Sequence, residues 1–154
     1  KPVAKPKNLK PGGFRYHYYE GVWDSLPNFA TLKPVASGIA GQGFNFTKLP
    51  RQTNFACLIE GYIEIKHDGY YVFILDSDDG SKFYLKNKLL MNNDGLHAMG
   101  DAKTYLVPLE KGFYPIRVEL FQKEGGVDLQ LMYITPGTNA PAPLPIPLEV
   151  QYSN

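Results

Sequence analysis

Apolar and polar residues alternate with a period of two over much of the chain, which is the pattern of strands that bury one face. Within residues 14–19, Phe14, Tyr16 and Tyr18 fall on one side of such a strand. Similar alternation or short apolar runs occur at residues 55–65, 70–76, 82–86, 89–92, 104–109, 113–121 and 127–134. Turn signals separate these stretches. The sequence therefore predicts an all-β fold of roughly eight to ten antiparallel strands, arranged as a sandwich or barrel.

The predicted connections carry residues suited to tight reversals of the chain. Residues 67–69, with the sequence His-Asp-Gly, separate two strands as a hairpin turn, and Asn87 tolerates the positive φ of another tight turn. Helical periodicity is nearly absent. A short helical turn is expected near residues 24–27, where Ser25 serves as a cap and Pro27 fits the first turn.

Both ends of the chain differ in composition from the part between them. Residues 1–13 are rich in Lys and Pro and close on two glycines, which is typical of a linker. Residues 136–154 are rich in proline and show no strand or helix period, so an extended strap or tether is expected there. A β module is predicted over residues 14–135. The chain starts at Lys1 without a signal peptide, and we interpret it as a trimmed piece of a longer protein.

Composition narrows the functional classes. The chain of 154 residues is 44% hydrophobic and 20% charged, and its formal net charge is only +1, which describes a soluble globular domain. No dense basic cluster is present, so no nucleic-acid partner is expected. The longest apolar run, residues 70–75, is too short for a membrane span. The single cysteine, Cys57, is in phase with Phe55 and Ile59 and is expected to be a buried, inert thiol.

Two adjacent carboxylates, Asp78 and Asp79, follow the apolar run 70–75 and precede Gly80. A strand that ends this way places negative charge at the rim of a sheet, where loops carry binding sites. Neighbouring side chains of an extended strand point apart, but a cis peptide bond between the two residues would let both face one hard cation. Calcium, which collects oxygen ligands, is the candidate. The alternative is that residues 76–80 form a polar turn, since Asp and Gly are favoured there on local grounds.

Other chemistry is weakly signalled. Residues 92–97 form a second loop rich in side-chain oxygens, and Asn93, Asp94 or His97 would contact a ligand there unless the loop is simply a polar turn. Eleven tyrosines, nine phenylalanines and one tryptophan suit either a β core or stacking on sugar rings.

No catalytic motif is visible in the sequence. The spacing of Asp and Glu singles out no glycosidase carboxylate pair. Residues 76–87 fail the EF-hand pattern, and phosphate loops, nucleophile elbows and zinc patterns are absent. The chain is therefore not expected to be an enzyme.

Several segments together resemble the protective-antigen-fourteen module, named for a fragment of anthrax toxin protective antigen and shared by fungal flocculin adhesins and many bacterial glycosidases. The matching segments are residues 14–21 with Trp23 and Leu26-Pro27, residues 55–65, 68–73, 77–85, 114–119 and 129–131. Their order and spacing cover most of the chain between its two ends. The resemblance implies a β-sandwich or barrel of two antiparallel sheets that is appended, without catalytic activity, to extracellular proteins.

The resemblance also implies a site. In glycan-binding members, adjacent aspartates joined by a cis peptide hold a calcium ion that ligates sugar hydroxyls, and Asp78 and Asp79 match those positions. The adhesins complete the site with an asparagine on a loop that corresponds to residues 122–128, where this chain has none. Asp128 or Glu124 would have to substitute as oxygen ligands, and Lys123 would repel a cation.

The sequence thus leads to one hypothesis and one rival. The first is a non-catalytic carbohydrate-binding or targeting module of a larger secreted, glycan-active protein, located outside the cell, in the periplasm or on the cell surface. Calcium would be held by Asp78 and Asp79. Its partners would be a glycan and a catalytic domain of the same polypeptide. The expected ligand-binding residues are Asn93, Asp94, His97, Glu124 and Asp128. The rival is a structural accessory module that packs on a parent glycoside hydrolase and has no ligand of its own.

Overall fold

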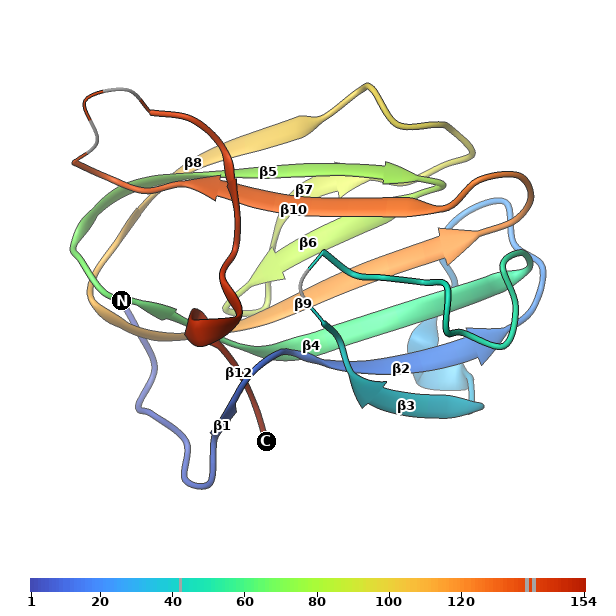
Figure 1. The fold of residues 1–154 in the computed structure, drawn as a ribbon, viewed down its shortest axis with the longest axis horizontal. Coiled ribbons are helices and arrows are strands. Elements are labelled where there is room, and N and C mark those ends of the chain that lie inside the picture. Colours follow the sequence, from blue (N-terminus) through green and yellow to red (C-terminus); the bar gives the residue numbers. More distant parts are fainter. Residues whose placement is uncertain (42, 138, 140) are drawn as a thin grey trace.

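The computed structural model describes residues 1–41, 43–137, 139 and 141–154 and consists of two antiparallel sheets packed face to face (Figure 1). The strands of the larger sheet are β1 (Lys10–Pro11), β2 (Arg15–Glu20), β3 (Ala36–Ile39), β4 (Phe55–Ile65), β6 (Ser81–Leu85), β7 (Lys88–Asn93), β9 (Gly112–Gln122) and β12 (Gln151–Ser153). The smaller sheet contains β5 (Gly69–Asp78), β8 (Lys103–Leu109), β10 (Asp128–Ile134) and β11 (Leu144–Pro145). The predicted all-β fold is confirmed.

The pairing order explains how the sandwich is built. The larger sheet runs β1-β12-β4-β9-β6-β7, and β2 pairs with β4 and carries β3 on its outer side. Because β9 pairs with β4 along its whole length, β2 and β12 share the other edge of β4. The smaller sheet runs β11-β10-β5-β8. The turn from β5 into β6 therefore passes from one sheet to the other at Asp79 and Gly80.

The core lies between the sheets and is built from the inward positions predicted by the period-two pattern. Phe14, Tyr18, Phe55, Phe73 and Phe83 are at most 1% exposed and come from both sheets. Phe73 and Phe83 face each other across the sandwich with their ring centroids 5.2 Å apart. Each such side chain stabilises the fold by about 1.5–3 kcal/mol through removal of its apolar surface from water. Cys57 is buried as expected, and burial raises the pKa of its thiol to about 12.

A second, smaller apolar cluster covers the outer face of the larger sheet at one end. Tyr19 and Phe121 point away from the main core, yet both are buried because residues 21–32 fold back over them. In this segment a 3-10 helix, η1 (Phe29–Thr31), begins after Asn28, whose side chain accepts a hydrogen bond from the Ala30 amide. The helical turn expected at residues 24–27 therefore lies a few residues later, since Asn28 rather than Ser25 caps it.

The two ends of the chain are joined to the body of the fold. Residues 144–145 pair with β10, and residues 151–153 pair with β4 and with β1. Ile146, which precedes the 3-10 helix η2 (Leu148–Val150), and Val150, the last residue of that helix, are buried in the core. The expectation that residues 136–154 contain no strand is thus wrong for these two short segments. Pro145 is tolerated because β11 is an edge strand, where a missing amide donor costs little.

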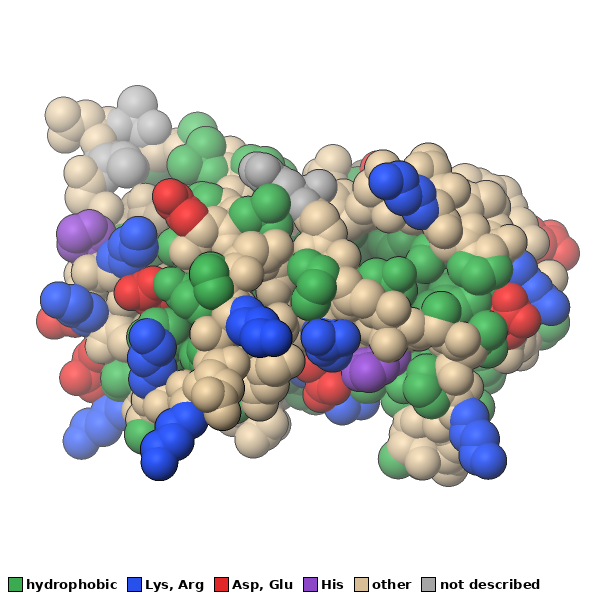
Figure 2. All heavy atoms as spheres, turned by 60° about the horizontal axis from the view of Figure 1, so that its bottom comes forward, with side chains coloured by type: hydrophobic (Ala, Val, Ile, Leu, Met, Phe, Trp, Pro, Cys, Tyr) green, Lys and Arg blue, Asp and Glu red, His purple; other side chains and the backbone are tan. Residues whose placement is uncertain are grey.

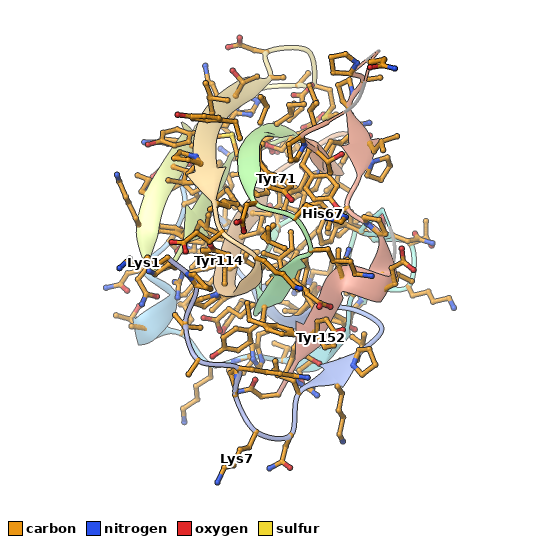
Figure 3. All side chains as sticks on the ribbon, turned by 90° about the vertical axis from the view of Figure 1, so that its left-hand side faces the viewer. Lys1, Lys7, His67, Tyr71, Tyr114 and Tyr152 are labelled. Atoms are coloured by element: carbon orange, nitrogen blue, oxygen red, sulfur yellow. The ribbon has the colours of Figure 1, made fainter. Side chains whose placement is uncertain are left out.

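Tyrosine hydroxyls fix the end of the sandwich shown in Figure 3. The Tyr71 hydroxyl donates to the His67 carbonyl at 2.6 Å, and the Tyr114 hydroxyl donates to the Glu110 carbonyl at 2.7 Å. The Tyr152 hydroxyl donates to the Glu64 carboxylate at 2.9 Å. These bonds hold the last strand and the two turns that connect β4 to β5 and β8 to β9. The chain passes from one sheet to the other at both turns, so the prediction of a hairpin at residues 67–69 is wrong.

No helix within the described residues is long and apolar enough to cross a bilayer. On the face shown in Figure 2, basic and acidic side chains are interspersed, and no large field of one charge covers it. This distribution agrees with the formal net charge of +1.

Candidate functional site

The candidate site lies at the opposite end of the sandwich, at the right-hand side of Figure 1. Here β5 ends at Asp78, β9 ends at Gln122 and β10 begins at Asp128. The segment that follows β2 and the segment that follows β7 are linked by a hydrogen bond from the Leu26 amide to Asp94 Oδ1 at 2.9 Å. We refer to this end, formed by residues 21–28, 78–80, 92–97 and 122–128, as the rim.

Asp78 and Asp79 converge at the rim. The peptide bond between them is cis, and their carboxyl groups lie within hydrogen-bonding reach of each other. Burial raises the pKa of the Asp78 carboxyl, and the adjacent charge of Asp79 raises it further. Two ionised carboxylates held together repel each other, and a divalent cation is the partner that would relieve this repulsion.

Hydroxyl groups beneath the pair hold the turn in place. The Ser77 hydroxyl donates to the Asp79 carbonyl at 2.7 Å and lies 2.6 Å from the Ser81 hydroxyl. Both serines are fully buried. Gly80 allows close packing, because a Cβ there would lie 2.5 Å from a ring carbon of Phe121 and 2.6 Å from the Gly95 amide nitrogen. The turn therefore has a fixed shape set by neighbouring strands.

The loop 122–128 approaches both carboxylates with its backbone. The Lys123 amide donates to Asp79 Oδ2 at 2.9 Å, and Gly126 lies beside Asp78 Oδ2. The Lys123 ammonium instead contacts Asp24, at 2.7 Å. The pKa of Lys123 is raised mainly by the hydrogen bond to Asp24 and by the charge of Asp24, and to a smaller extent by the charges of Glu124 and Asp79. The repulsion expected between Lys123 and a cation is thus reduced by Asp24, a residue that the sequence analysis did not single out.

The loop 92–97 places its three expected residues in different roles. Asn93 is 4% exposed, with its carbonyl accepting from His97 Nε2 at 2.7 Å. Asp94 Oδ1 accepts from the amides of Leu26 and Gly95, so this carboxylate ties two loops together. His97 Nδ1 also faces a carbonyl, that of Ala98, at 3.1 Å. Burial lowers the pKa of His97, but the two carbonyls and the charges of Asp79 and Asp78 outweigh it and raise the pKa overall.

The remaining two expected residues lie on the loop before β10 and at its first position. Asp128 stands opposite Asp78 in the strand register, and its charge contributes to the raised pKa of Asp78. Its Oδ1 also accepts from the Leu129 amide at 2.8 Å. Glu124 is exposed, and its charge reaches Lys123 rather than the aspartate pair. Asp128 therefore belongs to the acidic end of the rim, while Glu124 lies at its margin.

Two buried polar atoms of rim residues have no hydrogen-bond partner within the described residues. These are Asn93 Nδ2 and Gln122 Oε1, whose residues are 4% and 0% exposed. The Gln122 amide is held by its nitrogen, which donates to the Gly125 carbonyl at 2.8 Å, so its oxygen is left as an acceptor. Gln122 was missed by sequence reasoning, which looked for an asparagine in the same loop. Buried polar groups without a partner are uncommon and often mark the place of an ion, water or ligand.

These side chains fit an oxygen-ligated cation in part. The convergent aspartates supply charge and Gln122 supplies a neutral oxygen, which are donors that calcium accepts. Where the chain is described, however, no group of three or more His, Cys, Asp and Glu side chains is arranged to hold a metal ion. An ion here would complete its coordination with backbone carbonyls, water or ligand hydroxyls.

Comparisons with known proteins agree with the geometry. The family model described as "PA14 domain" matches residues 31–145. No curated protein matches the chain in sequence. Among solved structures, the PA14 domain of the antifreeze protein MpAFP superposes with a TM-score of 0.72 at 15% identity, covering 99% of this chain and 96% of that one.

Two further structures show the range of proteins that share this fold. Epithelial adhesin 6 A domain from Candida glabrata, solved in complex with Galb1-3GlcNAc, superposes with a TM-score of 0.70 at 18% identity and covers 97% of this chain and 90% of that one. Beta-glucosidase from Kluyveromyces marxianus, in complex with glucose, superposes with a TM-score of 0.64 at 20% identity. That match covers 82% of this chain but only 16% of the enzyme. At these identities the likeness concerns the fold.

Proposed function

Because the chain belongs to the PA14 domain family, we propose that it is a non-catalytic carbohydrate-binding module that binds glycans through a calcium ion at the rim. The observation that carries this proposal is the convergence of the Asp78 and Asp79 carboxyl groups at a rim that also holds two buried side-chain atoms without a hydrogen-bond partner among the described residues. Similar domains of adhesins supply the second support, since one was solved with a bound disaccharide.

Each rim residue has a distinct proposed role. Asp78 and Asp79 would hold the ion, with Gln122 as a neutral oxygen donor in the loop that lacks an asparagine. The calcium ion would coordinate vicinal sugar hydroxyls. Asp128 and Asn93 would face the sugar. Asp94 would position the loops rather than touch the ligand, because its Oδ1 already accepts from the Leu26 amide.

The remaining two expected residues have weaker roles in the proposal. His97 would orient Asn93 through its bond to the Asn93 carbonyl, and the exposed Glu124 would contact only a ligand larger than one sugar ring. Sugar hydroxyls already form good hydrogen bonds with water, and the net gain per bond is small. A single module is therefore expected to bind one sugar unit weakly.

The setting of the module is part of the same proposal. We place it in a secreted or cell-surface protein, in line with the adhesin domain of similar fold. A catalytic partner in the same polypeptide is supported by the beta-glucosidase, of which a comparable module makes up a small part.

A calcium titration followed by thermal unfolding tests the metal half of the proposal. Calcium at millimolar concentration should raise the Tm, because a ligand that binds only the folded state stabilises it by mass action. The double substitution Asp78→Asn with Asp79→Asn should abolish the shift. Glu110→Gln, at an exposed side chain between β8 and β9 at the opposite end of the sandwich, should keep it. An unchanged shift in the double variant would contradict calcium binding at the pair.

A glycan array with calcium or with a chelator tests the sugar half. Binding that appears only with calcium and disappears in the double variant supports the proposal. Binding that is equal in chelator places the glycan elsewhere. Turnover of a chromogenic glycoside by the isolated chain would contradict the non-catalytic assignment.

A structural accessory module is the second candidate, and one surface favours it. On the outer face of the smaller sheet, Tyr70 is 64% and Leu106 62% exposed. Tyr70 and Leu106 lie on the paired strands β5 and β8, and Val72 is the register partner of Leu106. A neighbouring domain that packs here would protect Tyr70. A Leu106→Lys substitution that separates the module from its parent, while leaving the calcium shift intact, would support this role.

A further inference from the structure

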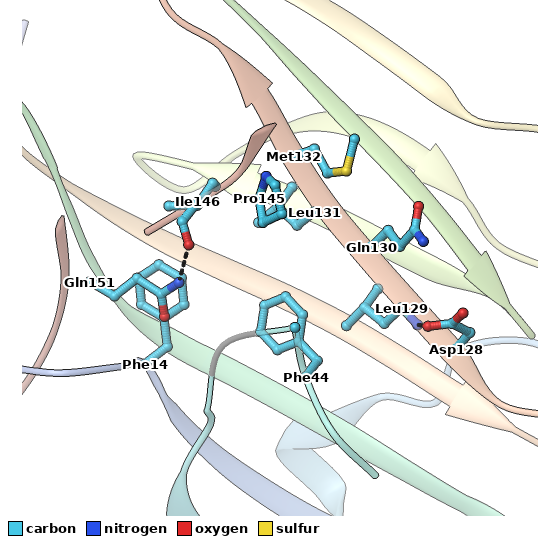
Figure 4. Close-up of a pocket in the computed structure, with 11 residues that line it drawn as sticks. Phe14, Phe44, Asp128, Leu129, Gln130, Leu131, Met132, Pro145, Ile146 and Gln151 are labelled. Atoms are coloured by element: carbon cyan, nitrogen blue, oxygen red, sulfur yellow. Dashed lines mark hydrogen bonds between the residues drawn. The ribbon is translucent and has the colours of Figure 1, made fainter. Parts of the chain in front are cut away.

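A cavity of about 180 Å³ lies beside β10, between the part of its edge that β11 leaves unpaired and the segment around Phe44 (Figure 4). Apolar side chains form most of its wall, and they come from β10, from the segments before β2 and after β3, and from the C-terminal segment. Those that matter for its shape are Phe14, Phe44, Leu129, Leu131 and Ile146. The cavity is separate from the aspartate pair. It reaches the rim only at Asp128, whose Oδ1 is engaged by the Leu129 amide.

One polar side chain in this wall is not satisfied. Gln151 is 3% exposed, and its Oε1 has no hydrogen-bond partner within the residues that the structure describes. The orientation of the amide is fixed, because Nε2 donates to the Ile146 carbonyl at 2.9 Å, as the dashed line in Figure 4 marks. The backbone of Gln151 is fixed as well, since its carbonyl accepts from the amides of Gly12 and Gly13. The structure therefore holds a buried acceptor at the wall of an apolar cavity.

A buried acceptor without a donor costs about 1–3 kcal/mol, and native proteins rarely keep one without a partner. The partner has to donate one hydrogen bond and otherwise present apolar surface to the two phenylalanines and the leucines. Its size is bounded by the volume, since a cavity of about 150 Å³ accommodates benzene.

We propose that this cavity is a second binding site, for a small ring compound that carries a single hydroxyl group, with the hydroxyl donating to Gln151 Oε1. The class is that of phenols and cyclic alcohols. A free sugar does not fit this description, because its several hydroxyls would lose water against apolar walls that return no hydrogen bonds. This site goes beyond the proposed glycan site, and neither depends on the other.

Phenol and toluene form the matched pair of probes, since they share a ring and differ in the donor. The titration is followed by NMR of the methyl groups of Leu129, Leu131, Met132 and Ile146, with chelator present so that calcium has no part. Phenol should cause saturable shifts of these methyls, and contacts between phenol protons and the same methyls should appear. Phenol should bind about threefold to tenfold more tightly than toluene, the advantage that one net hydrogen bond provides.

Two substitutions separate the parts of the site. Gln151→Met keeps the length of the side chain but removes the acceptor, so phenol should lose its advantage over toluene. Leu129→Phe fills the space, so both probes should lose binding. If either variant fails to fold, the methyl contacts of phenol in the unmodified chain decide.

Three outcomes would overturn the proposal. In the first, phenol binds without contacts to these methyls. In the second, toluene and phenol bind the unmodified chain equally. In the third, a crystal structure grown with phenol shows only a water molecule on Gln151 Oε1.

Discussion

Asp78 on β5 and Asp128 on β10 stand directly opposite each other and form the last registered pair of the smaller sheet at the rim. Asp79 adds a third carboxyl group within hydrogen-bonding reach of Asp78. Like charges at directly opposed positions of a sheet destabilise the pairing. The rim is therefore a place where the fold, without a cation, carries unfavourable charge.

Replacing Asp78 by Asn should raise the Tm of the calcium-free chain at pH 7, by the equivalent of about 0.2–1 kcal/mol. The pKa of Asp78 is raised in the folded state, so ionisation of this group is less favourable there than in the unfolded chain. Its destabilising effect is therefore complete at neutral pH and fades as the pH falls through the raised pKa. Scanning calorimetry of both chains in chelator measures the Tm difference at pH 7 and at pH 4.

Calcium should raise the Tm of the same variant far less than it raises the Tm of the unmodified chain. The variant lacks one of the two charges proposed to hold the ion. A chain with Glu110→Gln serves as the control for loss of one surface charge, at the opposite end of the sandwich. If Asp78→Asn lowers the Tm in chelator, the carboxylates are not in net repulsion and the case for a cation there is weakened.

The sequence predicted most strands well and placed the aspartate pair at the end of a strand, but it did not predict the contacts that hold the rim together. Strands β5 to β10 begin and end within two residues of the expected positions, because each is either an apolar run or an alternation of large apolar and polar residues, with turn residues close to its ends. Strand β3 was missed, because its four residues, Ala-Ser-Gly-Ile, offer no large residue on the inward side.

Long-range contacts explain what the sequence could not provide at the site. The ion pair of Lys123 with Asp24 joins residues 99 positions apart, and the bond from Leu26 to Asp94 joins residues 68 apart. No local pattern signals either contact. The Gln122 oxygen without a partner among the described residues could not be predicted either, because its lack of a donor depends on the residues packed around it in the fold. A glutamine at the end of a strand gives no such signal in a sequence.

His97 should make the stability of the rim depend on pH. Its two ring nitrogens face the carbonyls of Asn93 and Ala98, and only the protonated ring donates to both. The folded-state pKa is raised, so this stabilisation is complete below the ordinary pKa of about 6.5 and is lost as the pH rises through the folded value.

The measurement is the Tm difference between the unmodified chain and His97→Gln, taken in chelator at pH 6 and pH 8. The difference should be larger at pH 6, by the equivalent of about 1 kcal/mol, the worth of one hydrogen bond. His67→Gln is the control, because the side chain of His67 is exposed at the far end of the sandwich. A difference that grows toward pH 8 would contradict the raised pKa.

Asp94→Ala should loosen the rim without disturbing the core. The variant removes the acceptor for the amides of Leu26 and Gly95 and thus the direct link between two rim loops. A hydrogen bond to a charged acceptor contributes about 1.5–3 kcal/mol, and a loss near the lower end is expected because the site is only half-buried. Hydrogen exchange of the Leu26 amide should accelerate, while exchange in β4 and β9 stays slow. Unchanged protection of Leu26 would show that other contacts hold residues 21–28.

Gly80→Ala should destabilise the rim more than any charge substitution at the pair. A methyl group at this position would meet a ring carbon of Phe121 at 2.5 Å, the Gly95 amide nitrogen at 2.6 Å and Asp94 Oδ1 at 2.8 Å. Two of these atoms belong to the loop 92–97, and the Gly80 carbonyl accepts from the Phe121 amide at 3.0 Å, so the turn has no direction in which to move. Overpacking of this kind costs about 1–3 kcal/mol.

Gly41→Ala is the matched control, because a methyl group there meets no atom of the described residues within 4 Å, its chain neighbours aside. It should be neutral or slightly stabilising, since alanine reduces the freedom of the unfolded chain. Urea unfolding of both variants gives the two free energies directly. Because displacement of the loop 92–97 would also shift Asn93 and Asp94, Gly80→Ala should weaken the calcium response even where the chain stays folded. A Gly80→Ala chain that is as stable as the Gly41→Ala control would mean that the turn is loose, and the close approach of the rim loops would have to be abandoned.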